Sequence, residues 1–321
     1  MEKFTYRTLP VSSLDPAAPL SLRFAPAAVP ESLQDSVARQ GVVMPIWVTQ
    51  AASPVIVAGY RRVAAARQAG LSTVPALILN ETLAETELFL LAVLCNWQTP
   101  WEDLDRAVCL GKAEALGLDP KEITAAVLPA LGLEPANYVF EEYLATAKLD
   151  AEVLQAIDEQ KLPFRGARQL GRWPRRDQQQ FVRLIAVHAA LTTQELIKTV
   201  ESLYGHRCQS GQDLEETLKL LGAETVLNHA VWDRRLKGEK FCQLLREQMH
   251  PALTAQEKKF AEALKAAPEF SGDFRVEAPA FFEDQGYQLR AKIKNKADLG
   301  RFCQLLEKRR EWLNSLFDIM L

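Results

Sequence analysis

The sequence predicts an α+β protein that is mainly helical, with strands only near the two ends of the chain. Runs rich in β-branched residues fall within the first eighty residues, and alternating strand patterns return between residues 274 and 293. The long stretch between them follows helical periodicity. The length of 321 residues exceeds what one hydrophobic core usually serves. We therefore expect three domains, over residues 1–85, 86–205 and 206–321.

The N-terminal domain is predicted to be a small α/β unit. Five prolines among the first thirty residues predict an extended or looped start. Glycines and prolines then separate short periodic segments in the order helix, strand, strand, helix, strand. The expected bounds are Glu31–Gln40, Ile46–Thr49, Val55–Ala58, Arg61–Ala69 and Val74–Leu79.

The middle domain is predicted to be all-helical and to contain a helix-turn-helix. Asp119 is the expected cap of a helix with Pro120 in its first turn, and Gly132 makes the turn after it. The candidate recognition helix follows over Pro135–Lys148. Pro129 lies inside the first of these helices and lacks the N–H group that a helix interior needs, so we expect a kink there.

The C-terminal segment is predicted to be a small α/β dimerisation module. Two alternating strands, at 274–277 and 287–293, flank the turn residues Asp284, Gln285 and Gly286, which predicts a hairpin. A segment this small has too little core to be very stable alone, so we expect it to pair across a homodimer. A single final helix from Ala297 is expected to carry one apolar face, made of Leu299, Phe302, Leu306, Leu313 and Leu316.

Composition and residue spacing exclude several classes of protein. The net charge of -3 argues against a chain that is basic throughout. The five cysteines and four histidines are dispersed without zinc-ligand spacing, and we assign no catalytic residue and no metal ligand. The start of the chain lacks a secretory pattern, and no apolar run reaches the ~20 residues of a membrane span. We therefore expect a cytoplasmic protein without a membrane partner.

The strongest local motif is a glycine followed by two arginines where a strand meets a helix, at Gly59, Arg61 and Arg62. Such a turn collects free backbone N–H groups at a helix N-terminus and adds two guanidinium groups. Both features suit a phosphate. The alternative is an ordinary strand-to-helix turn with solvated arginines.

The order of these motifs resembles the N-terminal domain of the ParB chromosome-partitioning family, a domain shared more distantly with sulfiredoxin. The resemblance continues through the segment from Leu94 to Leu104 and through the helix-turn-helix to about residue 200. The segments that carry it in the first eighty residues are Gly41-Val42-Val43-Met44-Pro45-Ile46, Gly59-Tyr60-Arg61-Arg62 and Val74-Pro75-Ala76-Leu77-Ile78.

The resemblance implies a CTP-binding, DNA-binding protein associated with the nucleoid, in which a ParA-type ATPase is a candidate partner. Carried over by position, Gly59, Arg61 and Arg62 would cradle the phosphates of CTP or another nucleotide. Asn96 would face the nucleotide, and its pocket would be lined by Gly41, Met44 and Pro45.

Three positions depart from the family pattern. Tyr60 and Cys95 stand where the family has glutamates, and Thr99 stands where it has an arginine. A magnesium–triphosphate complex needs anionic oxygen ligands and cationic partners, so these departures disfavour magnesium and efficient hydrolysis. We expect a pocket that either binds no nucleoside triphosphate or binds one without hydrolysing it.

Two segments bear on DNA binding. The candidate recognition helix offers Asn137 and Tyr138 as base readers but is acidic, and carboxylates meet phosphate repulsion in the major groove. Residues 161–183 instead carry seven cations against one acid, which suits contacts with backbone phosphates. The alternative is a basic face that is solvated or paired with acidic residues. The assigned phosphate contacts are Arg165, Arg168, Arg172, Arg175 and Arg176.

The sequence thus favours a homodimeric ParB-like protein that binds double-stranded DNA for partitioning or transcriptional regulation. Two alternatives stay open. One is an adaptor that keeps the scaffold for protein contacts without specific DNA binding. The other is a nucleotide-dependent kinase or nuclease on the same fold, which the altered positions Tyr60 and Cys95 disfavour.

Overall fold

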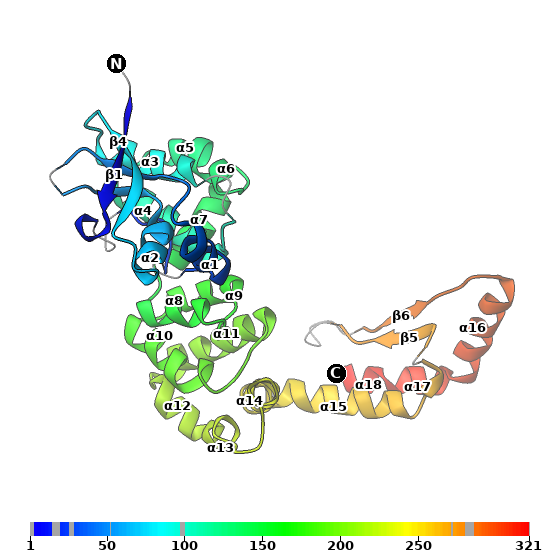
Figure 1. Ribbon diagram of the computed structural model, residues 1–321. Helices are drawn as coiled ribbons and strands as arrows, with labels where there is room; N and C mark the ends of the chain where they lie inside the picture. Colours follow the sequence, from blue (N-terminus) through cyan, green and yellow to red (C-terminus); the bar gives the residue numbers. More distant parts are fainter. Residues whose placement is uncertain are drawn as a thin grey trace. The chain divides into compact units, whose positions relative to one another are not determined.

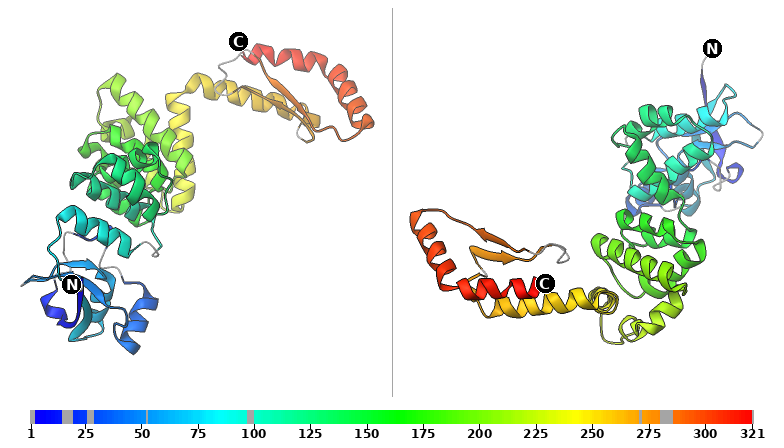
Figure 2. Two further views of the ribbon diagram at one scale, coloured as in Figure 1. Left: turned by 90° about the horizontal axis from the view of Figure 1, so that it is seen from above. Right: turned by 180° about the vertical axis from the view of Figure 1, so that it is seen from behind.

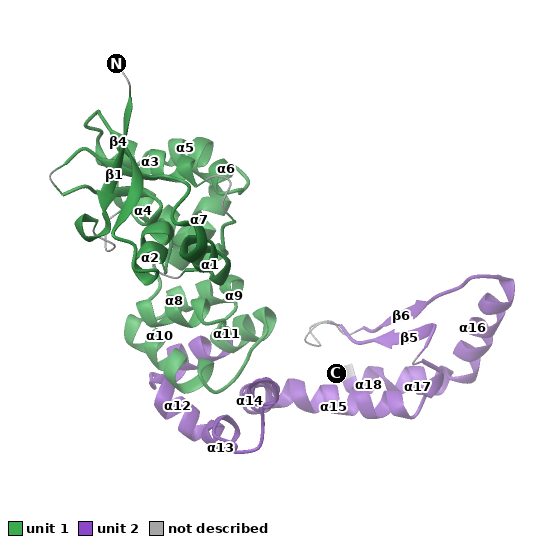
Figure 3. Ribbon diagram, in the orientation of Figure 1, with its two compact units in different colours: residues 1–201 green, residues 202–321 purple. Residues whose placement is uncertain are grey.

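The computed structural model describes residues 3–14, 20–25, 29–51, 53–96, 100–270, 272–279 and 286–320. The chain forms two compact units, Met1–Glu201 and Ser202–Leu321 (Figure 3). It is mixed α+β and mainly helical, with a four-stranded sheet in the first unit and a two-stranded hairpin in the second, which confirms the predicted fold class (Figure 1). The three predicted domain limits stay predictions.

The sheet of the first unit has the strand order β1-β4-β2-β3, from β1 (Phe4–Pro10), β4 (Thr73–Leu79), β2 (Ile46–Thr49) and β3 (Ile56–Ala58). The pairing of β2 with β4 is parallel, and the other two pairings are antiparallel. Residues 4–10 were expected only to be extended or looped, whereas they form the edge strand β1. Three of the five prolines behind that prediction, at 16, 19 and 26, lie outside the described residues.

The helices α1 (Glu31–Gln40) and α2 (Tyr60–Gln68) pack together in the same unit, close to their predicted bounds. Val63 and Ala66 of α2 are buried in a core with Ile46, Ile56 and Val74 from the sheet. Burial of such β-branched and small side chains fixes α2 against the strands, and with it the turn that precedes the helix.

A helical region completes the first unit, and α4 and α7 are its most extensively packed pair. Its helices are α3 (Glu85–Cys95), α4 (Asp103–Ala115), α5 (Pro120–Glu122), α6 (Leu128–Ala130), α7 (Asn137–Ala147), α8 (Ala151–Asp158), α9 (Phe164–Ala167) and α10 (Arg175–Phe181), followed by α11 (Thr193–Ser210). The irregularity expected from Pro129 takes the form of a π-helical turn over Ile123–Val127. The candidate recognition helix begins two residues later than predicted, because Pro135 and Ala136 lie outside α7.

The second unit joins helices to the predicted hairpin (Figure 2). The strands β5 (Phe274–Glu277) and β6 (Gln288–Ala291) pair antiparallel, which confirms the hairpin; of its expected turn residues, Asp284 and Gln285 lie outside the described residues. Its helices are α12 (Leu214–Leu220), α13 (Ala223–Leu227), α14 (Arg234–Met249), α15 (Pro251–Lys265), α16 (Lys296–Lys308), α17 (Arg310–Ser315) and α18 (Phe317–Met320).

The prediction of a single final helix was wrong. The helix breaks at Arg309, whose guanidinium forms an ion pair with Glu269 at 2.6 Å. Leu313 and Leu316, beyond the break, are buried with Phe260 and Phe270, whereas Leu299 stays half exposed. The predicted apolar face is therefore divided, because the chain changes direction between its two halves. Among the described residues, no helix is long and apolar enough to cross a membrane.

Candidate functional site

The turn between β3 and α2 depends on a glycine. Gly59 has φ 109°, in the left-handed region that favours glycine. A Cβ atom at this position would lie 2.7 Å from Cγ2 of Ile46, which is closer than side-chain atoms approach one another. The next residue also fixes the turn, since the Tyr60 hydroxyl donates a hydrogen bond to the Ile56 carbonyl oxygen at 2.6 Å. Tyr60, which stands where the family has a glutamate, therefore stabilises the turn through this hydrogen bond.

A cavity of about 600 Å³ opens beside this turn, a volume in the range of small-molecule sites. Four of the seven residues predicted for the nucleotide pocket line it, namely Gly59, Arg61, Arg62 and Asn96. The other three, Gly41, Met44 and Pro45, are not among the described residues of its lining. Apolar side chains supply another part of the wall: Leu20, Leu22, Leu33, Val57 and Trp101.

The two arginines of the turn have different surroundings. Arg62 Nη1 donates hydrogen bonds to the carbonyl oxygens of Met44 at 2.8 Å and Pro45 at 2.5 Å. Burial lowers the pKa of Arg62, which stays charged because its ordinary value is so high. Met44 and Pro45 are thus linked to the turn by the side chain of Arg62. This arginine holds the loop before β2 against the start of α2.

Arg61 is the less engaged of the two. Its Nε atom is buried and has no hydrogen-bond partner among the described residues. Burial lowers the pKa of Arg61, and the neighbouring charge of Arg23 lowers it further. The charges of Asp105 and Glu102 oppose this shift in the pKa of Arg61.

Arg23 and Trp101 form a wall of the cavity that the sequence did not reveal. Arg23 forms an ion pair with Asp105 of α4, and its Nη2 donates to the Pro100 carbonyl oxygen at 2.9 Å. The guanidinium carbon also lies 4.9 Å from the centre of the Trp101 ring, within cation–π range. Nothing in the proline-rich segment around Arg23 indicates this role, because Asp105 lies 82 residues further along the chain.

The residues at the expected metal position do not fit a magnesium ion. Burial raises the pKa of the Cys95 thiol, although the positive charge of Arg62 opposes the shift, so the group stays neutral near pH 7. The Asn96 amide donates to the Ala92 carbonyl oxygen at 2.7 Å. The described residues contain no group of three or more histidine, cysteine or acidic side chains that could hold a metal. Thr99 lies outside the described residues.

The candidate helix-turn-helix is held by polar contacts centred on Asp103 at the start of α4. Its Oδ1 accepts hydrogen bonds from the Tyr143 hydroxyl of α7 at 2.7 Å and from Arg106 at 2.8 Å. Arg106 in turn donates from Nε to the Leu131 carbonyl oxygen at 3.1 Å, directly before the Gly132 turn. Burial and the hydrogen bond to Asp103 raise the pKa of Tyr143 to about 12, although Arg106 opposes the shift. The turn and both of its helices are thereby held against α4.

The exposed face of α7 is acidic. Asn137, Tyr138 and Glu141 are all exposed on it. The Tyr138 hydroxyl donates to Glu134 at 2.5 Å, a bond that raises the pKa of Tyr138. The Asn137 side-chain oxygen accepts a hydrogen bond from Thr124 at 3.3 Å. Both predicted base readers therefore already have partners within the chain.

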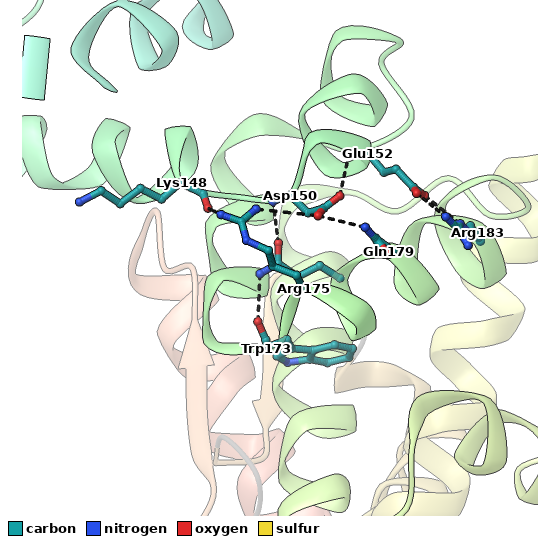
Figure 4. A network of polar contacts seen from close by, with 8 residues as sticks. Lys148, Asp150, Glu152, Trp173, Arg175, Gln179 and Arg183 are labelled. Atoms are coloured by element: carbon teal, nitrogen blue, oxygen red, sulfur yellow. Dashed lines mark hydrogen bonds and ion pairs between the residues drawn. The ribbon is translucent and has the colours of Figure 1, made fainter. Parts of the chain in front are cut away.

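Four of the seven cations in residues 161–183 are paired with carboxylates. Arg175 lies 3.8 Å from Asp150, which also accepts a hydrogen bond from Gln179 at 3.1 Å, and Arg183 donates to Glu152 at 2.9 Å (Figure 4). The two remaining pairs are Lys161 with Glu159 at 2.5 Å and Arg168 with Glu142 at 3.2 Å.

Arg165 and Arg172 differ from these four cations. Both are exposed, and neither makes an ion pair within the described part of the chain. Arg176 is exposed beside them on α10. Trp173, which lies among these cations in the sequence, is buried and packs edge-on against Phe181 at 5.7 Å, so it is not available to stack on a base.

Comparison with known proteins identifies the first part of the chain. Residues 1–94 match the family model of the ParB N-terminal domain. Over these residues, the α/β fold with its glycine-arginine turn is therefore similar to the ParB N-terminal domain. No curated protein matches the chain significantly.

Similar solved structures include two of ParB from Caulobacter crescentus. One is truncated at its C-terminus and complexed to the centromeric parS site; it is 19% identical with a TM-score of 0.37, covering 61% of this chain and 98% of that one. The other is complexed with CTP-gamma-S, at 21% identity and a TM-score of 0.25, covering 56% and 97%. A Pnob8-like ParB-N domain is 12% identical with a TM-score of 0.31, covering 78% and 97%.

Proposed function

We propose that this protein is a ParB-related DNA-binding protein that contacts the duplex through backbone phosphates. The observation that carries the proposal is the exposure of all six arginines between residues 165 and 183. They lie on α9, on the 3-10 turn Arg168–Arg172, on α10 and on the π-helical turn Val182–Ala186. Exposed guanidinium groups make phosphate contacts without reading sequence.

Base readout by Asn137 and Tyr138 contributes less in this proposal, because both already have partners and the exposed face of α7 is acidic. The protein would act as a homodimer through its C-terminal module, on nucleoid DNA in the cytoplasm and in response to a nucleotide. A ParA-type ATPase is the corresponding candidate partner. Partitioning and transcriptional regulation are both consistent with such a contact.

The test is the binding of the full chain to a labelled duplex of random sequence, followed by fluorescence anisotropy as salt is raised. We expect measurable affinity at low salt that falls steeply, since phosphate contacts release counterions. A matched duplex of different sequence should bind with an affinity within about threefold, which corresponds to less than 1 kcal/mol.

One observation favours the adaptor alternative. Four of the seven cations are paired with carboxylates of the same chain, and the exposed face of α7 is acidic, which together reduce the positive potential available to DNA. Absence of binding even at low salt would exclude the DNA-binding proposal and leave the adaptor.

A further inference from the structure

We propose that residues 246–258, where α14 meets α15, form a salt-sensitive elbow. Two ion pairs hold one angle between these helices, and screening of the pairs releases it. The elbow lies in the second unit, whereas the arginines of the proposed DNA contact lie in the first. Its conformational role is therefore separate from DNA binding.

A proline prevents α14 and α15 from forming one continuous helix. Pro251 is the first residue of α15, a position at which a helix does not use the N–H group. In a continuous helix its ring would clash with the Glu247 carbonyl oxygen, four residues earlier. The intervening residue His250, with φ -133° and ψ 58°, is not helical. The chain therefore changes direction between the two helices (Figure 2).

The two sides of the elbow have cores of their own. On the α14 side, Phe241 and Leu245 are buried, and α14 packs with α13. On the α15 side, Phe260 is buried with Phe270 and Leu316 in the core of the C-terminal module. Among the described residues, that core includes no side chain of α14. The angle between the helices therefore depends on contacts at the elbow itself.

The contacts across the elbow are polar. Arg246 of α14 forms an ion pair with Glu257 of α15, and the neighbouring Glu247 forms one with Lys258 at 3.2 Å. The Thr254 hydroxyl also donates a hydrogen bond to the Arg246 carbonyl oxygen at 3.1 Å. Two adjacent residues of one helix are thus paired with two adjacent residues of the other.

The spacing of these ion pairs makes them specific to the bent state. In both pairs the partners are 11 residues apart. On a continuous helix they would lie on the same face but about 16 Å apart along the axis, which is beyond the combined reach of the two side chains. Widening of the elbow separates the partners in the same way. Both pairs therefore form only while the helices are bent toward each other.

The exposure of these side chains makes the elbow responsive to salt. Arg246 and Lys258 are 54% and 65% exposed. Exposed ion pairs are weak, and the Debye length falls from ~10 Å at 0.1 M salt to ~3 Å at 1 M. Thr254 is 9% exposed, so salt affects its hydrogen bond much less. Screening therefore frees the angle while this bond keeps the ends of the helices together.

The test is the distance between two spin labels on the full chain, measured by double electron–electron resonance. Lys240 of α14 and Lys265 of α15 are exposed positions on either side of the elbow. Incorporated keto amino acids carry the labels there and leave the native cysteines unchanged, and dilution with unlabelled chain removes distances between chains. We expect a narrow distribution at about 0.05 M salt and one about twofold broader at about 1 M. Equal widths at both salt concentrations would overturn the proposal.

The matched variants are Arg246→Met/Lys258→Met and Lys219→Met/Arg235→Met. The first removes both ion pairs across the elbow. The second removes the same charge from two exposed pairs that lie within α12 and within α14. We expect the first variant to give the broad distribution already at low salt and the second to keep the narrow one. Equal widths for the two variants at low salt would contradict the assignment, and circular dichroism confirms that each variant is folded.

A charge exchange separates the electrostatic effect from the effect of side-chain size. At low salt, Arg246→Glu should broaden the distribution, because it places two carboxylates opposite each other. Arg246→Glu/Glu257→Arg should narrow it again, since opposite charges then face each other across the elbow. A distribution that stays equally broad after the second substitution would overturn the role of the ion pair.

Discussion

Arg62 Nη1 donates a hydrogen bond to the carbonyl oxygen of Met44 at 2.8 Å, and this bond gives Arg62 a structural role in the turn. The Pro45 carbonyl oxygen accepts from the same nitrogen. The sequence motif presents two adjacent arginines as equivalent phosphate ligands, whereas the fold uses one to hold the loop before β2. Arg61 lines the cavity, and its buried Nε lacks a hydrogen-bond partner among the described residues.

Replacing these two arginines should therefore have different effects on stability. We expect Arg62→Met to lower the free energy of unfolding by about 1.5–3 kcal/mol, because two backbone carbonyl oxygens lose a charged donor. Arg61→Met should change it by about 0.5 kcal/mol or less. Urea unfolding followed by circular dichroism measures both; equal losses would mean that the Met44 and Pro45 bonds contribute little.

Gly59→Ala should destabilise the first unit by about 2–4 kcal/mol. The new methyl group would have to displace Ile46 and would occupy a strained backbone conformation at the same time. Gly70→Ala is the matched control, since Gly70 also has positive φ, at 69°, but no atom lies within 4 Å of its added Cβ. We expect the control to cost about 1–2 kcal/mol in urea unfolding. A Gly59→Ala chain as stable as the control would show that the contact with Ile46 is readily relieved.

Cys95 should alkylate slowly at neutral pH. Its raised pKa keeps the thiol protonated, and only the thiolate reacts. Mass spectrometry after brief iodoacetamide treatment should show Cys208 and Cys303, both exposed, modified well before Cys95. The rate at Cys95 should rise with pH. Because Arg62 opposes the shift, Arg62→Met should raise the pKa of Cys95 and slow the reaction further; faster alkylation in a folded variant would contradict this electrostatic role.

Tyr143→Phe should lower the free energy of unfolding by about 1–2 kcal/mol, because Asp103 would lose a hydrogen-bond donor. Tyr6→Phe, at an exposed tyrosine of β1, should change it by about 0.5 kcal/mol or less. The difference between the native and Tyr143→Phe chains should be complete below the unfolded tyrosine pKa near 10. It should be lost as pH rises toward 12, the folded pKa of Tyr143. Urea unfolding at pH 7 and above pH 10 measures this; an equal difference at both would contradict the role of the hydroxyl.

Elements with strong local patterns could be predicted from the sequence. Glu31–Gln40 and Ile46–Thr49 have the bounds that their flanking prolines and glycines indicate. The strand β1 was missed although its residues are extended as expected, because its pairing with β4 depends on a segment about seventy residues away. The break at Arg309 likewise depends on Glu269, forty residues earlier.

The same distinction between local patterns and long-range packing applies to the candidate site. The glycine-arginine turn is a local motif and could be found in the sequence, whereas Arg23 and Trp101 could not, because tertiary packing alone brings them to the cavity. The excess of cations over residues 161–183 could be counted in the sequence. Its pairing with Glu142, Asp150 and Glu152 was not, since these acids precede their arginine partners by about 25–31 residues.

Contact with DNA through exposed arginines is the central claim, and the salt dependence of binding tests it most directly. The measurement is the slope of the logarithm of affinity against the logarithm of salt concentration for a random duplex. We expect Arg165→Ala/Arg172→Ala to reduce this slope by about two, since each lost phosphate contact removes about 0.9. Arg7→Ala/Arg39→Ala, which removes the same charge from exposed positions of β1 and α1, should leave it unchanged. Equal slopes for the native chain and Arg165→Ala/Arg172→Ala would contradict the account.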